Sequence, residues 1–96
     1  MKKEYYQDYS YIIEIDSKVV ARIDFPLLEN DNIVITHTFV DDSLRGQGIA
    51  SYLVGKVISF VKEKNYSIKA ECSYAVHYFE KNNIKEYRGI YDKSHK

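Results

Sequence analysis

The sequence is poor in cysteine, proline and tryptophan: its 96 residues include one cysteine, one proline and no tryptophan. A single cysteine cannot form an internal disulfide, which excludes a disulfide-stapled secreted scaffold and a zinc site built from several cysteines. No apolar run approaches the ~20 residues that span a bilayer, and the polar N-terminus lacks the apolar core of a signal peptide. We therefore expect a cytoplasmic protein that binds neither a membrane nor a metal.

The charges are balanced: the chain has fourteen basic and fourteen acidic residues, so its formal net charge is zero. This balance excludes a protein that binds through blanket positive charge, so no nucleic-acid partner is expected. Hydrophobic residues make up 45% of the chain and charged residues 29%, as in an ordinary globular domain. The length of 96 residues predicts one domain over 1–96, present as a monomer or a weak dimer.

The first 40 residues predict strands. Apolar and polar residues alternate with a period of two over residues 11–16 and again over 19–25, and the short polar break between them predicts a β-hairpin. Pro26 ends the second strand, because proline cannot donate to a ladder. A third strand is predicted over residues 33–40, which are rich in β-branched side chains.

The second half of the chain changes to a helical period. Apolar residues recur at the spacing that places them on one face of a helix, which predicts a helix from Ile49 to Lys64 with Asn65 as its C-terminal cap. A strand over 67–72 and a helix over 74–81 follow, and residues 84–91 remain open between an edge strand and a loose extension. The order β-β-β-α-β-α, with a possible final strand, predicts an α+β fold in which two helices flank a mixed, mostly antiparallel sheet.

The segment with recognisable chemistry lies where the third strand gives way to the first helix. The first turn of a helix has free N–H groups and partial positive charge, so it suits a phosphate. Gly46 and Gly48 allow close approach to the backbone there, and Arg45 adds a full positive charge. A Walker A loop is excluded because no Gly-Lys-Ser/Thr follows. The dinucleotide fingerprint is excluded because Ser51 stands where its third glycine or alanine belongs.

The same segment matches another pattern. Arg45-x-x-Gly48-x-Ala50 resembles the Gln/Arg-x-x-Gly-x-Gly/Ala signature of the GCN5-related N-acetyltransferases, in the strand-to-helix setting that the family requires. The resemblance implies an enzyme that moves an acetyl group from acetyl-coenzyme A to an amine. It also implies the binding residues. The pyrophosphate would lie on the backbone of Arg45, Gly46, Gln47, Gly48, Ile49 and Ala50, and the pantetheine arm would lie beside Phe39 and Val40.

Two further segments, His37-Thr38-x-Val40 and Cys72-Ser73-Tyr74-Ala75, resemble the compact branch of this family, often called the YjdJ-type domain. That branch lacks the N-terminal helix pair that covers the acceptor site in larger members. The resemblance therefore implies an open acceptor side, suited to a polyamine, a peptide or a protein lysine.

The general acid of the larger members is a tyrosine in a stretch like Ala-x-x-Phe-Tyr-x-Lys-x-Gly-Phe, and here Phe79 occupies its position. Tyr78 is one residue earlier, about 100° away around a helix. Cys72 is the candidate substitute, either accepting the acetyl group or protonating coenzyme A, and His37 and His77 are the candidates for moving protons.

Structural alternatives stand beside each of these roles. Cys72 alternates with Ile68 and Ala70, which also suits a packing cysteine. His37 alternates with Ile35 and Phe39, which suits a half-buried structural histidine, and His77 suits a solvated helix residue. The alternative function is a non-catalytic module that binds coenzyme A or an acyl-coenzyme A as a sensor or scaffold, and the missing tyrosine favours it.

Overall fold

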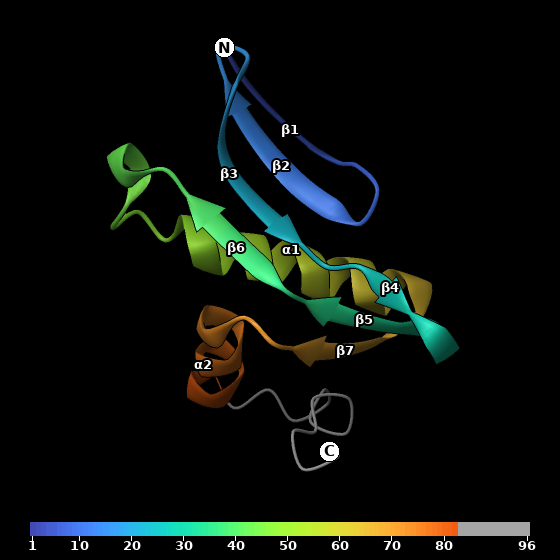
Figure 1. The fold of residues 1–96 in the computed structure, drawn as a ribbon. Helices are drawn as coiled ribbons and strands as arrows, with labels where there is room; N and C mark the ends of the chain where they lie inside the picture. Colours follow the sequence, from blue (N-terminus) through green and yellow to red (C-terminus); the bar gives the residue numbers. More distant parts are fainter. Residues whose placement is uncertain (83–96) are drawn as a thin grey trace.

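Two small sheets, rather than one, make up the β layer of the protein. The structure is a computed structural model that describes residues 1–82. The larger sheet is antiparallel, with strand order β1-β2-β3-β6 (Figure 1). Its strands are β1 (Lys2–Tyr6), β2 (Ser10–Ile15), β3 (Lys18–Asp24) and β6 (His37–Val40).

The smaller sheet has the order β4-β5-β7, and its strands β5 and β7 are parallel. A short 3₁₀ turn, η1 (Glu29–Asp31), connects the first two of its strands. The chain leaves the larger sheet after β6, passes through the first helix and enters the smaller sheet at β7. This crossover places β7 parallel to β5. The strands are β4 (Leu27–Leu28), β5 (Asn32–Ile35) and β7 (Ser67–Ala70).

The strand predicted over 33–40 is interrupted at Thr36, which separates β5 from β6. The pairing explains the interruption: Asp24 lies opposite His37, whereas Leu27 lies opposite Ile33. Two residues (25 and 26) therefore lie between these pairs on one side and three (34 to 36) on the other, and the third is the extra residue of a β-bulge. The bulge reverses the alternation of side chains beyond Thr36.

The bulge also makes β6 and β7 diverge. Among the described residues, β6 pairs only with β3, and β7 pairs only with β5. At the point of divergence, the backbone N–H groups of Glu71 and Cys72 both donate to the carbonyl oxygen of Ile35, at 2.9 and 3.0 Å. Within residues 1–82, the edge of β6 that faces away from β3 is left without a strand partner.

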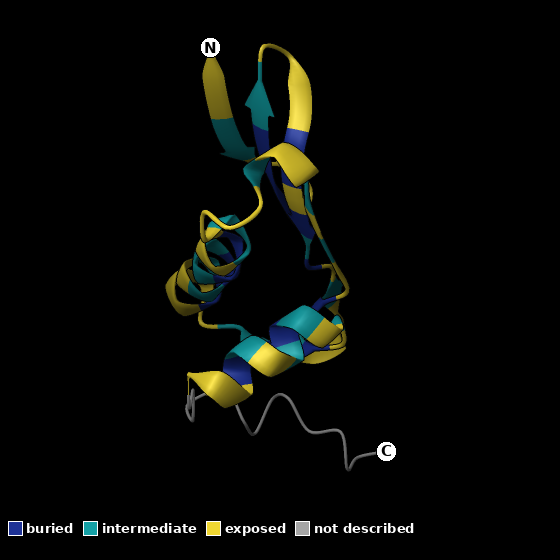
Figure 2. Ribbon diagram, turned by 90° about the vertical axis from the view of Figure 1, so that its left-hand side faces the viewer, coloured by how far each residue is buried: buried dark blue, intermediate teal, exposed yellow. Residues whose placement is uncertain are grey.

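Helix α1 (Ile49–Lys64) covers one face of the β layer (Figures 1 and 2). Asn65 caps it in the left-handed conformation, at φ 61°, and its N–H donates to the carbonyl groups of Val61 and Lys62. The predicted helix and its cap are thus confirmed. Its buried face packs on the core, through Leu53, Val54, Val57 and Val61.

Helix α2 (Ser73–Lys81) follows β7 and lies beside the end of that strand (Figure 1). Its buried residues, Ala75 and Phe79, join the same core as α1. The α+β class and the two predicted helices are confirmed, while β1 adds a strand that the sequence pattern did not indicate. The prediction for residues 84–91 lies outside the described residues. No helix of residues 1–82 is long and apolar enough to span a membrane.

Candidate functional site

The loop between β6 and α1 is shaped by side-chain capping and by two glycines. Asp41 begins a short 3₁₀ turn, η2 (Asp42–Leu44), and its carboxylate accepts hydrogen bonds from Ser43 N–H at 3.0 Å and Ser43 Oγ at 2.6 Å. These hydrogen bonds lower the pKa of Asp41. Gly46 and Gly48 then adopt positive φ angles of 82° and 74°. This conformation favours glycine and directs the chain into α1.

The two glycines border open space. A Cβ added at Gly46 or at Gly48 would meet no atom within 4 Å. Packing therefore does not require glycine at either position, although the backbone conformation does. A ligand can approach the backbone at this loop more closely than it could if either residue carried a side chain.

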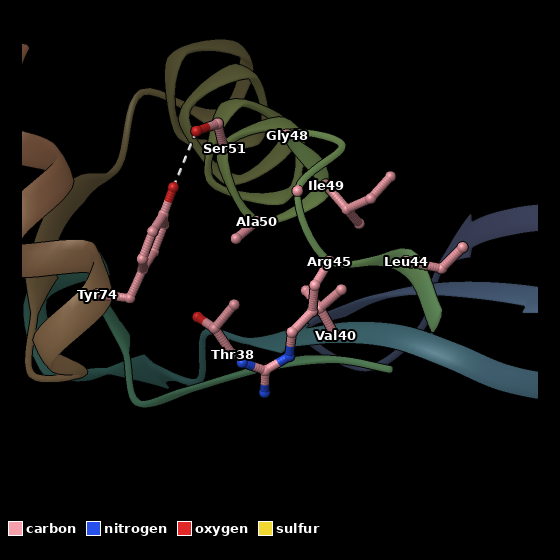
Figure 3. Close-up of a pocket in the computed structure, with 10 residues that line it drawn as sticks. Thr38, Val40, Leu44, Arg45, Gly48, Ile49, Ala50, Ser51 and Tyr74 are labelled. Carbon is pink, nitrogen blue, oxygen red and sulfur yellow. Dashed lines mark hydrogen bonds between the residues drawn. The ribbon is translucent and has the colours of Figure 1, made fainter. Parts of the chain in front are cut away.

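A cavity of about 480 Å³ lies between β6, this loop and the start of α1 (Figure 3). Figure 3 shows Thr38 and Val40 on the strand side of the cavity, with Ala50 and Ser51 on the α1 side. Tyr74 of α2 closes a third side, and its hydroxyl group is hydrogen-bonded to Ser51 Oγ at 2.8 Å.

The cavity is positive at its loop end. The first backbone hydrogen bond of α1 runs from Tyr52 N–H to Gly48 O at 3.0 Å. The backbone N–H groups just before Tyr52 therefore have no acceptor within the helix. Arg45 lines the cavity and forms an ion pair with Asp42 in which Nε and Oδ1 are 2.9 Å apart. Both side chains are largely exposed, so the pair is weak and Arg45 is available to an anion.

Cys72 lies at the divergence of β6 and β7, where it caps α2. It is half-buried and packs at the edge of the core, and its Sγ is 3.4 Å from Thr38 Oγ1 across the gap between the two strands. Both expectations for this cysteine, a packing role and a place beside the cavity, are compatible with its position, and its catalytic role stays a prediction.

His37 does not occupy the face expected from the sequence. The bulge at Thr36 turns Thr38 and Val40 toward the cavity, so His37 and Phe39 alternate onto the other face and are exposed. The expectation of a half-buried histidine was therefore wrong. The imidazole lies opposite Asp24 in the strand register and does not line the cavity. The side chain of Phe39 does not line it either.

His77 is exposed on α2 and lines a second, smaller cavity together with Tyr78. Phe79, at the position of the missing acid, is only 5% exposed and belongs to the core. The side chain of Tyr78 therefore lines the smaller cavity whereas that of Phe79 packs in the core, as the rotation of ~100° between neighbouring helical residues predicted. The catalytic role of His77 stays a prediction.

Sequence reasoning missed Thr38, Ser51 and Tyr74 as site residues. Alternation along β6 was available as a signal for Thr38, but the bulge inverted it. The pairing of Ser51 with Tyr74 joins residues 23 positions apart and depends on how α2 lies against α1. The sequence offered no signal for that contact.

Comparisons with known proteins agree with this geometry. A family model described as GCN5-related N-acetyl-transferase matches residues 9–90. The NMR structure of a GCN5-like protein from Staphylococcus aureus is 31% identical, covers 94% of this chain and 87% of that one, and has a TM-score of 0.73. A Bacillus anthracis structure solved with acetyl coenzyme A shares the fold, at 23% identity, a TM-score of 0.60, and coverage of 75% and 44%.

Human N-acetyltransferase 8B is 36% identical over an alignment of 62 residues, and the match covers 59% of this chain. The chain spans about a quarter (27%) of the length of that relative.

Proposed function

This chain belongs to the GCN5-related N-acetyltransferase family, and from this premise we propose that it transfers an acetyl group from acetyl-coenzyme A to an amine. Family membership supports acetyl transfer in general. The observation that carries the proposal for this chain is the cavity where the glycine loop, the first turn of α1 and the edge of β6 that no strand of residues 1–82 pairs with meet.

The residues fit acetyl-coenzyme A in three ways. The amides of residues 45–50 and the helix dipole suit a pyrophosphate, and Arg45 can add a charge-assisted hydrogen bond. The edge of β6 near Phe39 and Val40, which has no strand partner in the described part of the chain, offers backbone groups to the amides of the pantetheine arm. The open space at Gly46 and Gly48 leaves room for phosphate oxygens. A Bacillus anthracis relative of the same fold, solved with acetyl coenzyme A, supports this choice of ligand.

The proton needed by the departing thiolate must come from another group than the family's tyrosine, because Phe79 is buried in the core. In the direct route, the amine nitrogen attacks the thioester carbon, the carbon–sulfur bond breaks, and the coenzyme A thiolate takes a proton from the Cys72 thiol. The proton that the nitrogen loses then returns to the Cys72 thiolate. In the covalent route, the Cys72 thiolate attacks first and coenzyme A leaves. The amine then displaces the Cys72 sulfur from the acetyl group, and the proton that the nitrogen loses returns the cysteine to its starting state.

His37 and His77 remain the proposed proton carriers: neither lines the larger cavity, and both are exposed to the solvent through which a proton would reach it. His37 and Phe39 are exposed on the face of β6 that points away from the cavity, and 41% of Phe39 is accessible. This uncovered face supports an open acceptor side. This favours a polyamine, a peptide or a protein lysine over an enclosed small metabolite. The similar length of the Staphylococcus aureus structure supports placement in the compact, YjdJ-type branch.

The test measures coenzyme A release from acetyl-coenzyme A with spermidine or a lysine peptide as acceptor. We expect release that depends on acceptor, and Cys72→Ala should lower it at least ~100-fold, a barrier increase of ~2.7 kcal/mol. Cys72→Ser serves as the matched control for packing, because it keeps the size of the side chain. A rate unchanged in both variants would return Cys72 to a packing role.

A non-catalytic module that binds coenzyme A is the second candidate, favoured by the buried phenylalanine at the acid position. A thermal shift separates it from the enzyme. Ligand at ~100 times its Kd adds ~2.7 kcal/mol of apparent stability. A raised midpoint without acceptor-dependent release of coenzyme A would favour the module, and no shift at millimolar ligand would contradict both candidates.

A further inference from the structure

The outer face of α1 carries a line of four side chains that do not pack in the core. These residues, which we call the α1 seam, are Tyr52, Lys56, Ser59 and Glu63. They alternate at four and three positions, which is the spacing that aligns side chains along one helix for pairing with a second helix. Figure 2 shows α1 on the outside of the molecule, and every member of the seam is exposed except Lys56, which is half-buried.

The seam contains one charge of each sign. Lys56 and Glu63 are one heptad apart on the same side of α1, about 10 Å along its axis, so they are too far apart to pair with each other. Within residues 1–82 neither of them forms an ion pair. A second copy of α1 that runs in the opposite direction would place its own carboxylate beside Lys56 and its own ammonium group beside Glu63. The seam is therefore complementary in charge to itself.

The ammonium group of Lys56 is already oriented. Its Nζ is 5.2 Å from the ring centroid of Tyr52 and 5.5 Å from that of Tyr11, and Tyr6 Oη donates a hydrogen bond to the Lys56 carbonyl oxygen at 2.9 Å. Cation–π contacts attract the charge without accepting its N–H groups as a carboxylate would. Because the side chain is held in place, its pairing with an outside carboxylate costs less entropy.

Exposed tyrosines lie beside this charge. Tyr6 is 45% exposed and Tyr52 is 42% exposed. Tyrosine is enriched in protein interfaces, because its rigid ring buries a large area at a low cost in conformational entropy. Ser59 lies between the two charges of the seam, and its small side chain allows a second helix to approach. The seam thus combines aromatic anchors, matched charges and room for a partner.

We propose that the protein forms a symmetric dimer in which α1 packs antiparallel on α1 of a second copy. The two-fold axis passes beside Ser59, midway between Lys56 and Glu63, so Lys56 of each protomer pairs with Glu63 of the other. A two-fold contact of this kind is closed and does not extend into a filament. Both cavities stay accessible, because Ser51, which lines both, is about 100° around α1 from Tyr52 of the seam.

Sedimentation equilibrium of the full chain tests the dimer through exchanged charges. We expect the wild type to dimerise with a Kd on the order of 100 µM, because the contact is only one helix wide. Lys56→Glu opposes two carboxylates at each contact, and Glu63→Lys opposes two ammonium groups. Each variant alone should dimerise at least ~10-fold more weakly, a loss of ~1.4 kcal/mol.

An equimolar mixture of the two variants gives the sharpest result. In a heterodimer of Lys56→Glu with Glu63→Lys, opposite charges face each other at both contacts, so the mixture should associate with nearly the wild-type Kd. Lys18→Glu makes the same change of charge on the exposed turn between β2 and β3, away from the seam, and should dimerise like the wild type.

Three results would overturn the proposal: a wild type that stays monomeric at about 1 mM, single variants that dimerise as tightly as the wild type, or a mixture that associates no better than its components. Thermal melts show whether each variant is folded. If a charge reversal prevents folding, Lys56→Gln and Glu63→Gln take its place, and dimers of either variant as tight as the wild type would reject the ion pairs. All these outcomes leave the proposed acetyl transfer in place, because the seam does not line the larger cavity.

Discussion

Thr38 Oγ1 and Cys72 Sγ are 3.4 Å apart although the residues are 34 positions apart in the chain. They face each other across the divergence of β6 and β7, and Thr38 also lines the larger cavity. The hydroxyl group is thus the polar neighbour that the structure gives to the candidate cysteine. If the thiolate forms, this hydroxyl can turn its hydrogen toward the sulfur.

Replacing this hydroxyl group should make Cys72 less reactive. A hydrogen bond contributes about 0.5–1.5 kcal/mol, so Thr38→Val should slow alkylation of Cys72 by iodoacetamide at neutral pH by about 2- to 10-fold. Thr38→Ser keeps the hydroxyl and should react at nearly the wild-type rate. Mass spectrometry follows the reaction directly. A valine variant that reacts as fast as wild type would show that the pair does not assist the thiolate.

The loop at Gly48 can be tested without breaking the fold. Asparagine enters the left-handed region readily, so Gly48→Asn should keep the φ of 74° and move the thermal midpoint little. Its side chain would occupy the open space beside the loop, and acetyl-coenzyme A should bind at least ~10-fold more weakly, a loss of ~1.4 kcal/mol. Gly55→Ala is the control, because it adds a Cβ with equally free space on α1.

If Gly48→Asn bound with the affinity of the wild type while Gly55→Ala behaved the same, the pyrophosphate would not lie on this loop. A large fall in the thermal midpoint of Gly48→Asn would point instead to strain in the backbone, and Gly48→Ala could then separate the two effects. Calorimetric titration and a thermal melt on each variant are sufficient.

The ion pair between Asp42 and Arg45 should compete with the ligand. Asp42→Asn frees Arg45 and removes a negative charge near the proposed phosphate site, so acetyl-coenzyme A should bind about 2- to 5-fold more tightly at low salt. The gain should shrink at high ionic strength, because both side chains are exposed. Glu63→Gln, near the other end of α1, makes the same change of charge and should leave the Kd unchanged. Weaker binding by Asp42→Asn would mean that Asp42 orients Arg45.

Glu4 should make stability depend on pH. Its carboxylate accepts hydrogen bonds from Tyr52 and from Tyr11, the latter at 2.7 Å, and these lower its pKa below the usual 4.5. Because the folded pKa is depressed, the stabilisation is complete above the unfolded value and is lost as the pH falls through the folded one. At pH 7, Glu4→Gln should cost roughly 1 kcal/mol, or about 4–8 °C in the thermal midpoint.

The difference between Glu4→Gln and the wild type should shrink as the pH falls below the ordinary pKa of 4.5, because the wild type then progressively loses the same stabilisation. Thermal melts from pH 3 to 8 measure this dependence. Glu29→Gln, on the exposed turn before β5, serves as the control and should leave the curve unchanged. A Glu4→Gln deficit that stays constant over this range would assign the effect to packing rather than to charge.

Much of the site was accessible from the sequence because it is local. The signature from Arg45 to Ala50 lies in one loop and the first two residues of α1, and its glycines have the positive φ that such a turn favours. The period of α1 and its cap at Asn65 depend on neighbours within a few residues, and both were predicted correctly. The unpredicted β1 has no clear alternation and is defined by its pairing with β2.

The arrangement of side chains around the cavity was decided only by tertiary structure. The bulge at Thr36 arises from the pairing of β3 and β4 with β6 and β5, and one extra residue there exchanges His37 for Thr38 at the cavity wall. Strand register is fixed by hydrogen bonds between distant segments, so alternation within one segment cannot reveal such a shift. The sequence by itself determined the helices, the hairpin and the glycine loop. Long-range pairing decided which side chains meet at the divergence of β6 and β7.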